Sequence, residues 1–597
     1  MDRYSGVEPK VSIICIDCED SYIDAELAGM EYGSLDVVKT VSGPDLLEDV
    51  FYYAKSVDSK YITFLLPGQK MRERKIELMA DRLETAPEID ATVCNRCFTR
   101  EGRMIAQPDL CYSSAFCDQI VDGKMLLETC VVEGINLYGN LSTLMIRTDS
   151  LIARLSENGL QLKAEGMMTV LLNYLLLIGS HLIILEPPLI DSELSDYNKN
   201  LLRQNMTQYE NMLSLLKGEQ LFEEETFEKE KIMPVYMRML GENKDPEPCA
   251  AKKITFFYTD KGEYYNLEPI SQEAVKRGYD IRFTQDLKER AEIGIYCQHV
   301  SWQYAENSKF SVILLHDLAQ GHNRWPDIWN AERWNCFDLC VLPGGGWGDR
   351  WAECASMYWS QPARGAYLLG YPKSCCIKDE EIRERAVKLK SELGFTHDRT
   401  VLYAPSWEND EKEDDFIRAL ASLEVNLLIK QAHWPEEYAH IVKNIETMRS
   451  EHEGKYANVH YMEPEESILT ALEMCDLVVS DESNVMIEAL MFAKPSIAVT
   501  DWLIPDTQPS RFASVPFDCV YKCKKVELRE FVENILFRKK EVLDCEKLRE
   551  QYFCNAEHVN EDILDLIEYY TSRSEVREEK IQKYFVKPVY MPAALWD

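Results

Sequence analysis

Long apolar runs and positive charge are the two features this sequence has least of. The longest apolar stretch, Leu171 to Ile178, is interrupted by Asn173 and is far shorter than the roughly 20 residues that span a bilayer. No basic segment followed by an apolar one opens the chain, so we expect neither a secretory leader nor a membrane anchor. Lysine and arginine number 66 against 102 aspartates and glutamates, and the net charge of -36 argues against binding nucleic acid or anionic lipid through bulk charge. These absences predict a cytoplasmic protein that acts on a neutral or nucleotide-like small substrate.

The cysteines do not suggest a disulfide framework. There are 19, an odd number, scattered through apparent strands and helices, which favours free thiols in a reducing compartment. Two pairs with CxxC spacing, Cys15 with Cys18 and Cys94 with Cys97, leave a tetrathiolate zinc site open as one interpretation. However, Cys15 lies in the strand-like run Val11 to Ile16, where residues three apart point to opposite faces of a sheet. Buried core thiols are therefore the favoured interpretation.

The order of strand-like and helical segments predicts an α/β protein with several units. In the first block, residues 1–230, β-type runs such as Tyr61 to Leu65 and Leu182 to Leu185 alternate with helical stretches. A glutamate-rich segment and the polar stretch GENKDPE then predict a linker over residues 231–252. The second block begins with the strand-like run Lys253 to Tyr258 and is long enough for two doubly wound lobes. The tail, residues 573–597, either straps across the surface or is partly disordered.

The segment Cys475 to Val499 has the pattern of a strand, a polar turn, a helix and a second strand. The apolar residues Leu477 to Val479 fit a buried parallel strand, and Ser480-Asp481-Glu482-Ser483-Asn484 supplies caps for a helix that opens at Val485. Free backbone N–H groups at such a helix start favour a diphosphate, and Glu488, one turn inside, is placed to reach ribose hydroxyls. An ordinary capped turn explains the same pattern and, on spacing alone, is the simpler interpretation.

Two histidines follow expected strands of the second block. His316 comes directly after the run Val312 to Leu315, at the carboxyl edge of a sheet, where α/β folds place their sites. A histidine there is suited to act as a general base at neutral pH. His433, beyond the run Asn426 to Ile429 and near Lys430, is suited to stabilise charge on a leaving phosphate. A strand-capping histidine and a surface-loop histidine are the respective alternatives, and the residues alone leave both open.

Five short motifs occur in order in the second block. They are His316-Asp317, Gly370-Tyr371-Pro372-Lys373, Ala404-Pro405-Ser406-Trp407, Lys430-Gln431-Ala432-His433-Trp434-Pro435, and the 480–484 turn followed by Lys494-Pro495. In this order they resemble the CDP-glycerol glycerophosphotransferase family of teichoic acid synthesis, which has the GT-B fold. The corresponding family motifs are His-Gly, Gly-Tyr-Pro-Arg, Ala-Pro-Thr-Trp, Lys-x-His-Pro and Thr-Asp-Tyr-Ser-Ser. UDP-GlcNAc 2-epimerases share the last turn and its glutamate, so that motif alone does not separate the two families.

The resemblance implies a GT-B pair of Rossmann-like lobes, with residues 253–375 on the acceptor side and residues 376–572 on the nucleotide-donor side. It also implies an inverting transfer that needs no metal or other cofactor, with His316 as the base and His433 acting on the donor diphosphate. Together with the residue patterns, it gives the expected donor-binding residues as Ser406, Lys430, Asp481, Ser483, Asn484, Glu488 and Arg511. Arg511 also has a plain interpretation as a surface arginine. Departures at Asp317, at Lys373 and before His433 leave the donor open between a sugar nucleotide and CDP-glycerol.

The first block resembles a family-two glycosyltransferase of GT-A fold, over VSIICIDCED, YITFLLPGQKM and the segment that ends in LEPPLI. Active members carry Asp-x-Asp-Asp after the strand that matches Tyr61 to Leu65 and use it to chelate a metal, but here Leu66-Pro67-Gly68-Gln69 takes that place. The Glu-Asp pair that would carry the base is Glu165-Gly166. The resemblance therefore implies a catalytically inactive GT-A-like module that binds an acceptor glycan or organises an assembly. A generic Rossmann-like pattern is the alternative.

The leading hypothesis is a cytoplasmic transferase of bacterial surface polysaccharide or teichoic-acid-like polymer synthesis. Its partners would be a nucleotide-activated sugar or CDP-glycerol donor and a glycan or lipid-linked acceptor. A lipid-linked acceptor would bring it to the inner face of the membrane without an anchor. A UDP-sugar 2-epimerase-like enzyme or hydrolase on the same fold is one alternative. A non-catalytic scaffold of a glycan-synthesis complex is the other, and the two histidines and the phosphate turn argue against it.

Overall fold

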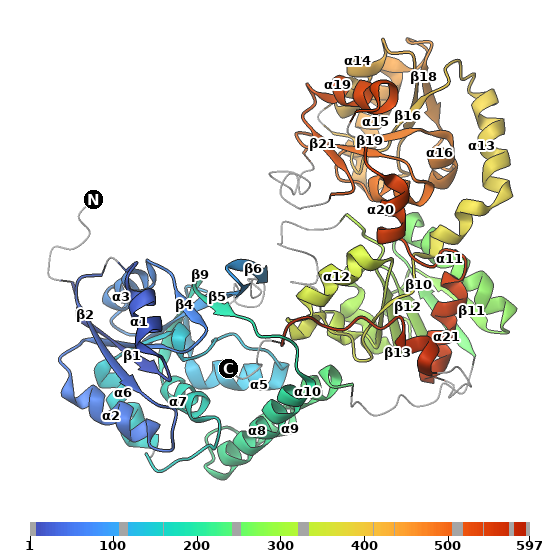
Figure 1. Ribbon diagram of the computed structural model, residues 1–597. Helices are drawn as coiled ribbons and strands as arrows, with labels where there is room; N and C mark the ends of the chain where they lie inside the picture. Colours follow the sequence, from blue (N-terminus) through green and yellow to red (C-terminus); the bar gives the residue numbers. More distant parts are fainter. Residues whose placement is uncertain are drawn as a thin grey trace.

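The chain folds into three α/β units, which we call the N-terminal domain, the N-lobe and the C-lobe (Figure 1). The computed structural model describes residues 8–30, 32–106, 117–158, 160–241, 252–319, 333–409, 411–434, 436–503, 518–540, 542–571 and 578–592. Each unit is built on its own sheet, and the predicted α/β class is confirmed for all three. Among the described residues, no helix is long and apolar enough to cross a membrane.

The N-terminal domain contains a mixed sheet of nine strands. Its main path runs in the order β2 (Leu35–Thr40), β1 (Val11–Ile16), β3 (Tyr61–Leu65), β8 (Leu144–Arg147), β5 (Ala91–Arg100), β9 (His181–Glu193) and β4 (Gln69–Met71). Strand β1 pairs in parallel with β2 and β3, whereas β3 pairs antiparallel with β8. Alternate residues of β1 enter two different core clusters, one under helix α2 (Leu46–Ser56) and the other under α3 (Lys75–Thr85). Helices therefore cover both faces of the sheet, as a fully apolar strand requires.

The predicted linker over residues 231–252 is wrong in its first part. Residues Ile232–Met239 form helix α10, and Ile232, Val235, Tyr236 and Met239 are buried in the core of the N-terminal domain. Their spacing places these side chains on one helix face. The N-terminal domain therefore extends to Leu240, and residues 242–251 of the predicted linker lie outside the described residues.

The N-lobe and the C-lobe each have an all-parallel sheet of six strands, which confirms the predicted pair of doubly wound lobes. In the N-lobe the order is β11 (Asp280–Thr284), β10 (Lys253–Phe257), β12 (Ala291–Tyr296), β13 (Ser308–Leu314), β14 (Leu339–Leu342) and β15 (Ala366–Leu368). In the C-lobe it is β18 (Val459–Met462), β17 (Asn426–Lys430), β16 (Thr400–Tyr403), β19 (Leu477–Ser480), β20 (Ser496–Val499) and β21 (Tyr521–Cys523). The strand order reverses between β10 and β12 and between β16 and β19, and such switch points mark the crevices in which α/β folds bind ligands.

The chain crosses between the two lobes twice. It enters the C-lobe through α13 (Glu380–Glu392) and returns after α20 (Cys545–Tyr552). Helix α21 (Val559–Thr571) then packs on the N-lobe sheet, where Ile563 and Ile567 share a core cluster with Phe256. The predicted end of the C-lobe at residue 572 is therefore too late, since α21 belongs to the N-lobe.

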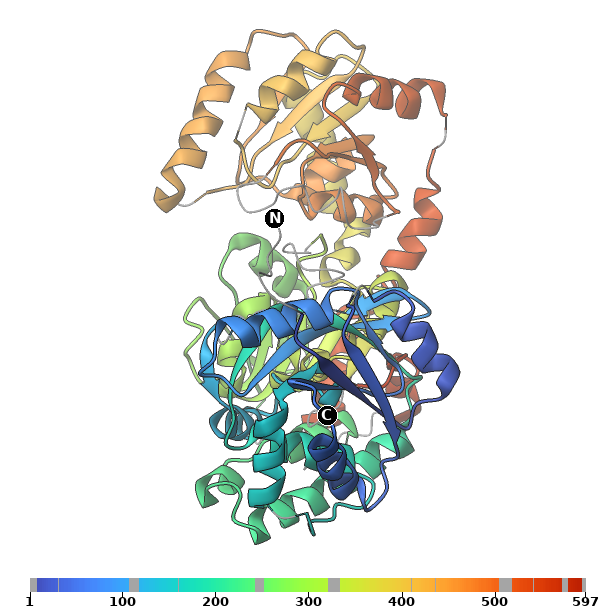
Figure 2. The same ribbon diagram turned by 90° about the vertical axis from the view of Figure 1, so that its left-hand side faces the viewer.

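The described part of the tail forms the strap that was one of the two predicted alternatives. After α22 (Glu578–Gln582), Phe585 makes an isolated β-bridge to Tyr367 of the N-lobe. Further along, Tyr590 bridges to Asp196 and is buried against the N-terminal domain. In the view of Figure 2 the N-terminal domain lies in front of the N-lobe, and the C-lobe stands above both. The strap thus joins the first two units.

Candidate active site

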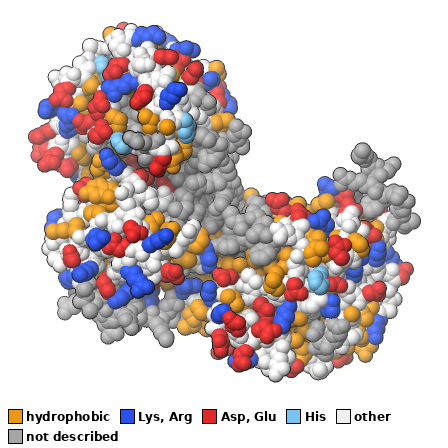
Figure 3. Space-filling view, turned by 180° about the vertical axis from the view of Figure 1, so that it is seen from behind, with side chains coloured by type: hydrophobic (Ala, Val, Ile, Leu, Met, Phe, Trp, Pro, Cys, Tyr) orange, Lys and Arg blue, Asp and Glu red, His pale blue; other side chains and the backbone are white. Residues whose placement is uncertain are grey.

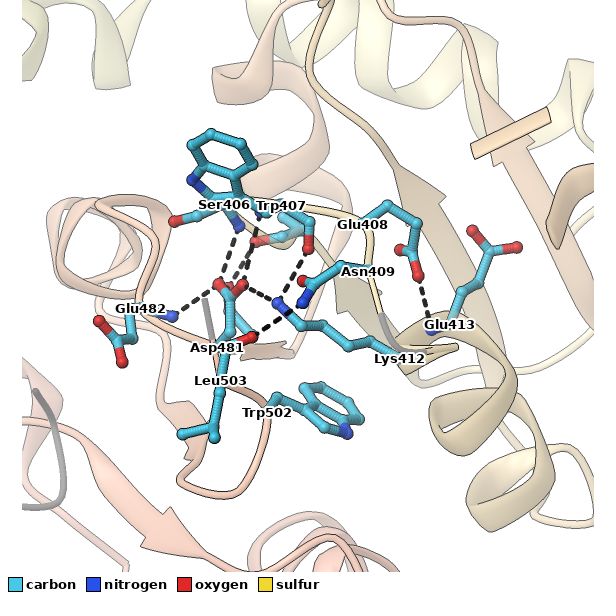
Figure 4. A network of polar contacts seen from close by, with 12 residues as sticks. Ser406, Trp407, Glu408, Asn409, Lys412, Glu413, Asp481, Glu482, Trp502 and Leu503 are labelled. Atoms are coloured by element: carbon cyan, nitrogen blue, oxygen red, sulfur yellow. Dashed lines mark hydrogen bonds and ion pairs between the residues drawn. The ribbon is translucent and has the colours of Figure 1, made fainter. Parts of the chain in front are cut away.

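A buried ion pair holds two loops together at the switch point of the C-lobe. Asp481, directly after β19, accepts hydrogen bonds from the backbone N–H of Ser406 at 2.8 Å and from Lys412 Nζ at 2.7 Å (Figure 4). Ser406 follows β16, and Lys412 is the first residue of α14 (Lys412–Leu420). The Lys412 ammonium also donates to the Trp407 carbonyl at 2.9 Å. The Lys412 and Asp481 side chains are 1% and 0% exposed. Burial alone would raise the pKa of Asp481, but Lys412 and the backbone N–H donors outweigh it and hold that pKa below its ordinary value.

The structure brings Ser406 and Asp481 together, as expected, and Asp481 has a structural role there. Asp481 also accepts from the Glu482 N–H at 2.6 Å, so its carboxylate anchors the two loops. The next turn has the predicted form of strand, turn, helix and strand. Ser483 Oγ accepts from the Val485 N–H at 3.3 Å, at the start of the short helix α17 (Val485–Glu488).

Asn484 connects the 480–484 turn of the C-lobe with the N-lobe. Its Oδ1 accepts from the Ala319 N–H at 3.0 Å. Its Nδ2 lies 3.4 Å from both the His316 carbonyl oxygen and Asp317 Oδ1. The predicted base and the predicted phosphate turn, 168 positions apart in sequence, therefore meet at the boundary between the lobes.

His316 is the first member of a buried chain of polar groups across that boundary. Its Nδ1 lies 3.2 Å from the Tyr371 hydroxyl, which donates to Glu488 Oε1 at 2.9 Å. Lys373 Nζ donates to the same carboxylate oxygen at 2.9 Å. His316 is 7%, Lys373 5% and Glu488 2% exposed, and Tyr371 is fully buried. Glu488 was predicted to hold ribose, but here its carboxylate is engaged by Tyr371 and Lys373.

The charges in this chain of groups follow from burial and pairing. Burial, reinforced by the Lys373 ammonium, lowers the pKa of His316, so the imidazole is neutral at neutral pH. Burial acts to raise the pKa of Glu488, but Lys373 outweighs it and holds that pKa below its ordinary value. The network therefore holds a neutral imidazole beside an ionised carboxylate.

The other ring nitrogen of His316 points toward the switch point of the N-lobe. A Cβ placed on Gly262, at the start of α11 (Lys261–Lys276), would lie 3.7 Å from His316 Nε2 and 3.0 Å from Asp260 Oδ1. Glu263 in the first turn of α11 is fully buried and accepts from Gln298 Nε2 at 3.1 Å, and this bond joins the helix to the loop after β12. Burial, with Asp260 nearby, raises the pKa of Glu263 to about 7. The surroundings of Nε2 are therefore acidic.

Three predicted site residues lie elsewhere. Lys430 is buried, and its ammonium donates to the carbonyls of Gln431 at 3.1 Å and Pro464 at 2.9 Å, while burial lowers its pKa to about 8. The His433 side chain is 50% exposed, and Nε2 lies 4.0 Å from a carboxylate oxygen of Glu465. The structure does not bring His433 into the His316 network. Arg511 lies outside the described residues.

Four residues in these networks had no predicted role: Tyr371, Lys373, Lys412 and Glu263. Tyr371 and Lys373 belong to a recognised motif, so the motif was a usable signal. Lys412 and Glu263 carry no such signal, because a buried charged residue is recognised only once its partner is known.

Among the described residues, no carboxylate cluster spaced for a metal lies in the N-terminal loops where the resemblance would place metal-dependent chemistry. In the turn after β3, the Leu66 N–H donates to Ser142 Oγ at 3.0 Å and Gln69 Oε1 accepts from Ser192 Oγ at 2.6 Å. Glu165 is exposed, and Gly166 has φ +73°. The GT-A-like assignment of this domain stays a prediction.

The paired cysteines do not gather into a metal site in the described part of the chain. Cys15, Cys18 and Cys94 are buried in one core cluster of the N-terminal domain. Within the described ranges, the one group of three side chains spaced to hold a metal is Asp414, Glu451 and His452. Asp414 already pairs with Arg418 at 2.7 Å. The arrangement supports the interpretation of the CxxC cysteines as core thiols.

Charged side chains of both signs are interspersed on the surface. On the face seen in Figure 3, acidic and basic groups alternate over all three units, and the described residues form no continuous basic stripe there.

Comparisons with known proteins agree with the motifs of the second block. Residues 352–504 match the family model described as CDP-Glycerol:Poly(glycerophosphate) glycerophosphotransferase, which confirms the predicted resemblance to a transferase family for this part of the chain. No curated protein matches the sequence.

Several solved structures are similar at low identity. The wall teichoic acid polymerase TagF is 14% identical, with a TM-score of 0.38, over 63% of this chain and 99% of its own. Anabaena HepE in complex with UDP and glucose is 13% identical, with a TM-score of 0.35, over 53% and 99%. A putative UDP-N-acetylglucosamine 2-epimerase from Listeria monocytogenes is 12% identical, with a TM-score of 0.38, over 55% and 99%.

Proposed function

Since residues 352–504 match the glycerophosphotransferase family, we propose that the two lobes transfer a glycosyl or glycerophosphate group from a nucleotide-activated donor to an acceptor hydroxyl. The reaction would serve the synthesis of a surface polysaccharide or teichoic-acid-like polymer. The observation that carries the proposal is the meeting of the buried, neutral His316 with the 480–484 turn at the lobe boundary.

In the proposed reaction the acceptor hydroxyl gives its proton to His316 Nε2. The acceptor oxygen forms a bond to the transferred carbon or phosphorus, and the bond to the nucleotide breaks with its electron pair going to the leaving phosphate. The transfer is inverting, because the attack comes from the face opposite the leaving group. General-base assistance of this kind contributes about 10²- to 10⁴-fold in rate.

The donor side of the proposal uses the C-lobe turn. Backbone N–H groups of Ser483 and Asn484, together with His433, would face the leaving phosphate and take the part that a metal ion plays in GT-A enzymes. Ser406 and Lys430 would border the donor, with Arg511 as a further phosphate partner. In this scheme Asp481 acts indirectly, by anchoring the loops.

The acceptor is proposed to be a glycan or a lipid-linked glycan. A lipid-linked acceptor would hold the protein at the inner face of the membrane, and the N-terminal domain would serve as a non-catalytic, acceptor-binding module. These assignments rest on the resemblances of the two blocks.

The proposal is tested first by ligand-dependent thermal unfolding. Wild-type protein is heated with CMP, CDP, UDP, GDP, CDP-glycerol and UDP-sugars, since a ligand at a hundred times its Kd adds about 2.7 kcal/mol to stability. Ser483→Glu places a negative charge at the turn and is expected to abolish the shift. Thr447→Glu, at an exposed position of α15 (Ala439–His452), adds the same charge to the same lobe and is expected to keep it.

The pattern of shifts decides between the functions. A cytidine-selective shift supports glycerophosphate-type transfer, and a uridine-selective one supports a sugar donor. Conversion of UDP-GlcNAc without an acceptor would replace the proposal with the epimerase. If no nucleotide shifts the unfolding temperature, the transferase proposal fails and the scaffold takes its place.

A further inference from the structure

The Tyr371 hydroxyl has one proton and two neighbours. It donates that proton to Glu488 Oε1 at 2.9 Å, because an ionised carboxylate can only accept. Its contact with His316 Nδ1 at 3.2 Å must therefore use the phenol oxygen as acceptor. A neutral imidazole carries one proton, so this contact requires the proton on Nδ1 and leaves Nε2 with a free lone pair.

Lys373 completes the arrangement by keeping Glu488 ionised. Its ammonium lies 2.9 Å from the same carboxylate oxygen, in a site where neither side chain is more than 6% exposed. Without the lysine, burial would favour the protonated acid, which could donate a hydrogen bond to the tyrosine. The Lys373–Glu488 ion pair thus decides which group donates each hydrogen bond between His316 and Glu488.

We propose that Tyr371, Glu488 and Lys373 are positioning residues that fix His316 in the tautomer protonated on Nδ1, so that Nε2 is the base. The inference rests on the proposed function for the use of Nε2, while the tautomer itself is a property of the protein without substrate. Glu488 comes from the C-lobe and the other three residues come from the N-lobe side. The base is therefore set only while the lobes are packed together.

The direction of Nε2 agrees with this assignment. It faces Gly262 at the start of α11, next to the switch point of the N-lobe, where an acceptor would bind. The same network stabilises the imidazolium that forms when Nε2 takes a proton, since Nδ1–H then points through Tyr371 to a carboxylate. The charged groups that face His316 from all sides are Asp317, Asp260, Glu488 and Lys373.

The first test reads the tautomer directly. The ¹⁵N spectrum of histidine-labelled protein distinguishes Nδ1–H from Nε2–H imidazoles, and a His316→Gln variant assigns the signal among the 10 histidines. We expect the Nδ1–H form in the wild type and a mixture in Tyr371→Phe, which keeps the ring but removes the hydroxyl. Protonation on Nε2 in the wild type would overturn the proposal, whether or not the protein is a transferase.

The second test uses opposite charges. Glu488→Gln removes a negative charge near His316, so the acidic limb of the kcat/KM profile is expected to move to lower pH by about 1 unit or more. Lys373→Met lets Glu488 take up a proton, so both charges of the pair are lost together and the acidic limb is expected to stay near its wild-type pH. The protonated acid donates to Tyr371, so this variant is expected to show the Nε2–H form and a lower kcat. A Lys373→Met protein with the wild-type Nδ1–H signal and full kcat would contradict the proposal.

Two controls keep the test independent of folding. Lys373→Arg retains the charge and is expected to keep the wild-type pH profile. Tyr371→Phe is expected to lower kcat by about 10- to 100-fold, the range found for partners that orient functional histidines, with the donor KM unchanged. A Tyr371→Phe protein that unfolds at the wild-type temperature and retains full kcat would also overturn the proposal.

Discussion

In both the N-terminal domain and the two-lobe block, loops follow the carboxyl ends of parallel strands, but the two regions place different side chains on them. In the N-terminal domain the loop after β3 is filled by Leu66-Pro67-Gly68-Gln69, which hydrogen-bonds to residues of its own domain such as Ser142, Ser192 and Tyr22. In the two lobes the loops after β13 and β19 carry His316 and Asp481, and each enters a buried charged network. The comparison shows that a sheet edge becomes a candidate site through the polar groups placed on it, not through the fold alone.

The largest expected effect separates the two regions by activity. His316→Gln should lower transfer by about 10²- to 10⁴-fold because it removes the general base, while nucleotide-dependent stabilisation stays intact. The matched change in the N-terminal domain, Glu165→Gln, should leave the rate within about twofold of wild type. Steady-state transfer assays check both. An inactive Glu165→Gln enzyme would mean that chemistry occurs in the N-terminal domain after all.

The buried ion pair of the C-lobe gives the next effect. Lys412→Met leaves Asp481 charged and without its cation, which should cost about 3–5 kcal/mol of unfolding free energy. Urea unfolding followed by tryptophan fluorescence measures the loss. The double variant Lys412→Met/Asp481→Asn should recover much of it. Equal stability of Lys412→Met and wild type would remove the anchoring role assigned to the pair.

Removal of a buried lysine in the N-terminal domain should raise the free energy of unfolding, whereas Lys412→Met lowers it. Lys75 is 0% exposed, its Nζ donates to Thr63 Oγ1 at 2.8 Å, and the structure gives it no carboxylate partner among the described residues. Burial lowers its pKa to about 8. Lys75→Met should therefore stabilise the domain by about 1–3 kcal/mol at pH 7, because a charged group no longer has to be buried. Destabilisation in thermal unfolding would show that the ammonium is needed there.

A pH-dependent contribution is expected from Glu413 of the C-lobe. It is fully buried, accepts from Gln431 Nε2 at 3.0 Å, and burial raises its pKa to about 7. The folded protein then binds more protons than the unfolded chain between pH 4.5 and 7, so stability falls as pH rises through that window. Glu413→Gln should flatten the fall by about 1–2 kcal/mol between pH 5 and 8. An unchanged slope in unfolding measured at several pH values would assign the pH dependence to other groups, such as Glu263.

The smallest effect concerns the charged surroundings of His316. Asp317 stands where the resembling family has glycine, and it lies with Asp260 and Glu263 near His316. Asp317→Asn keeps a polar side chain but removes a charge, so the KM for an anionic acceptor should fall about twofold, in line with a partly screened charge. Asp349→Asn, an exposed site on α12 (Gly345–Cys354), is the matched control. A fall in both variants would point to net charge and not to the site.

Much of the strand framework could be predicted because it depends on local pattern. The apolar run Val11–Ile16 is β1, and Tyr61–Leu65 is β3 at the expected residues. The segment after Leu477 forms the expected strand, turn and helix, since apolar and capping residues alternate there in an unambiguous order. The α10 helix was missed because the glutamates before it suggested a linker, while its buried face repeats only every three or four residues.

The site could be predicted only in part. His316 and the 480–484 turn were found because strand ends are marked in the sequence, and the structure brings them together. The partners of Glu488 and Asp481 could not be found, because Lys373 and Lys412 lie 115 and 69 positions away and no local pattern encodes such a pairing. His433 follows its strand as expected, yet its exposed side chain shows that a strand-end position does not by itself place a residue in a network.

The double crossing between the lobes makes the C-lobe an insertion in the N-lobe. The outgoing and returning segments lie side by side, since Asn555 Nδ2 donates to the Leu369 carbonyl at 3.1 Å and Lys378 pairs with Glu557. An insertion whose two ends adjoin can be removed or replaced as one cassette, with both junctions on one small patch of the host. For protein engineering, the C-lobe is thus a unit that can be exchanged while the N-lobe, the strap and the N-terminal domain keep their own packing.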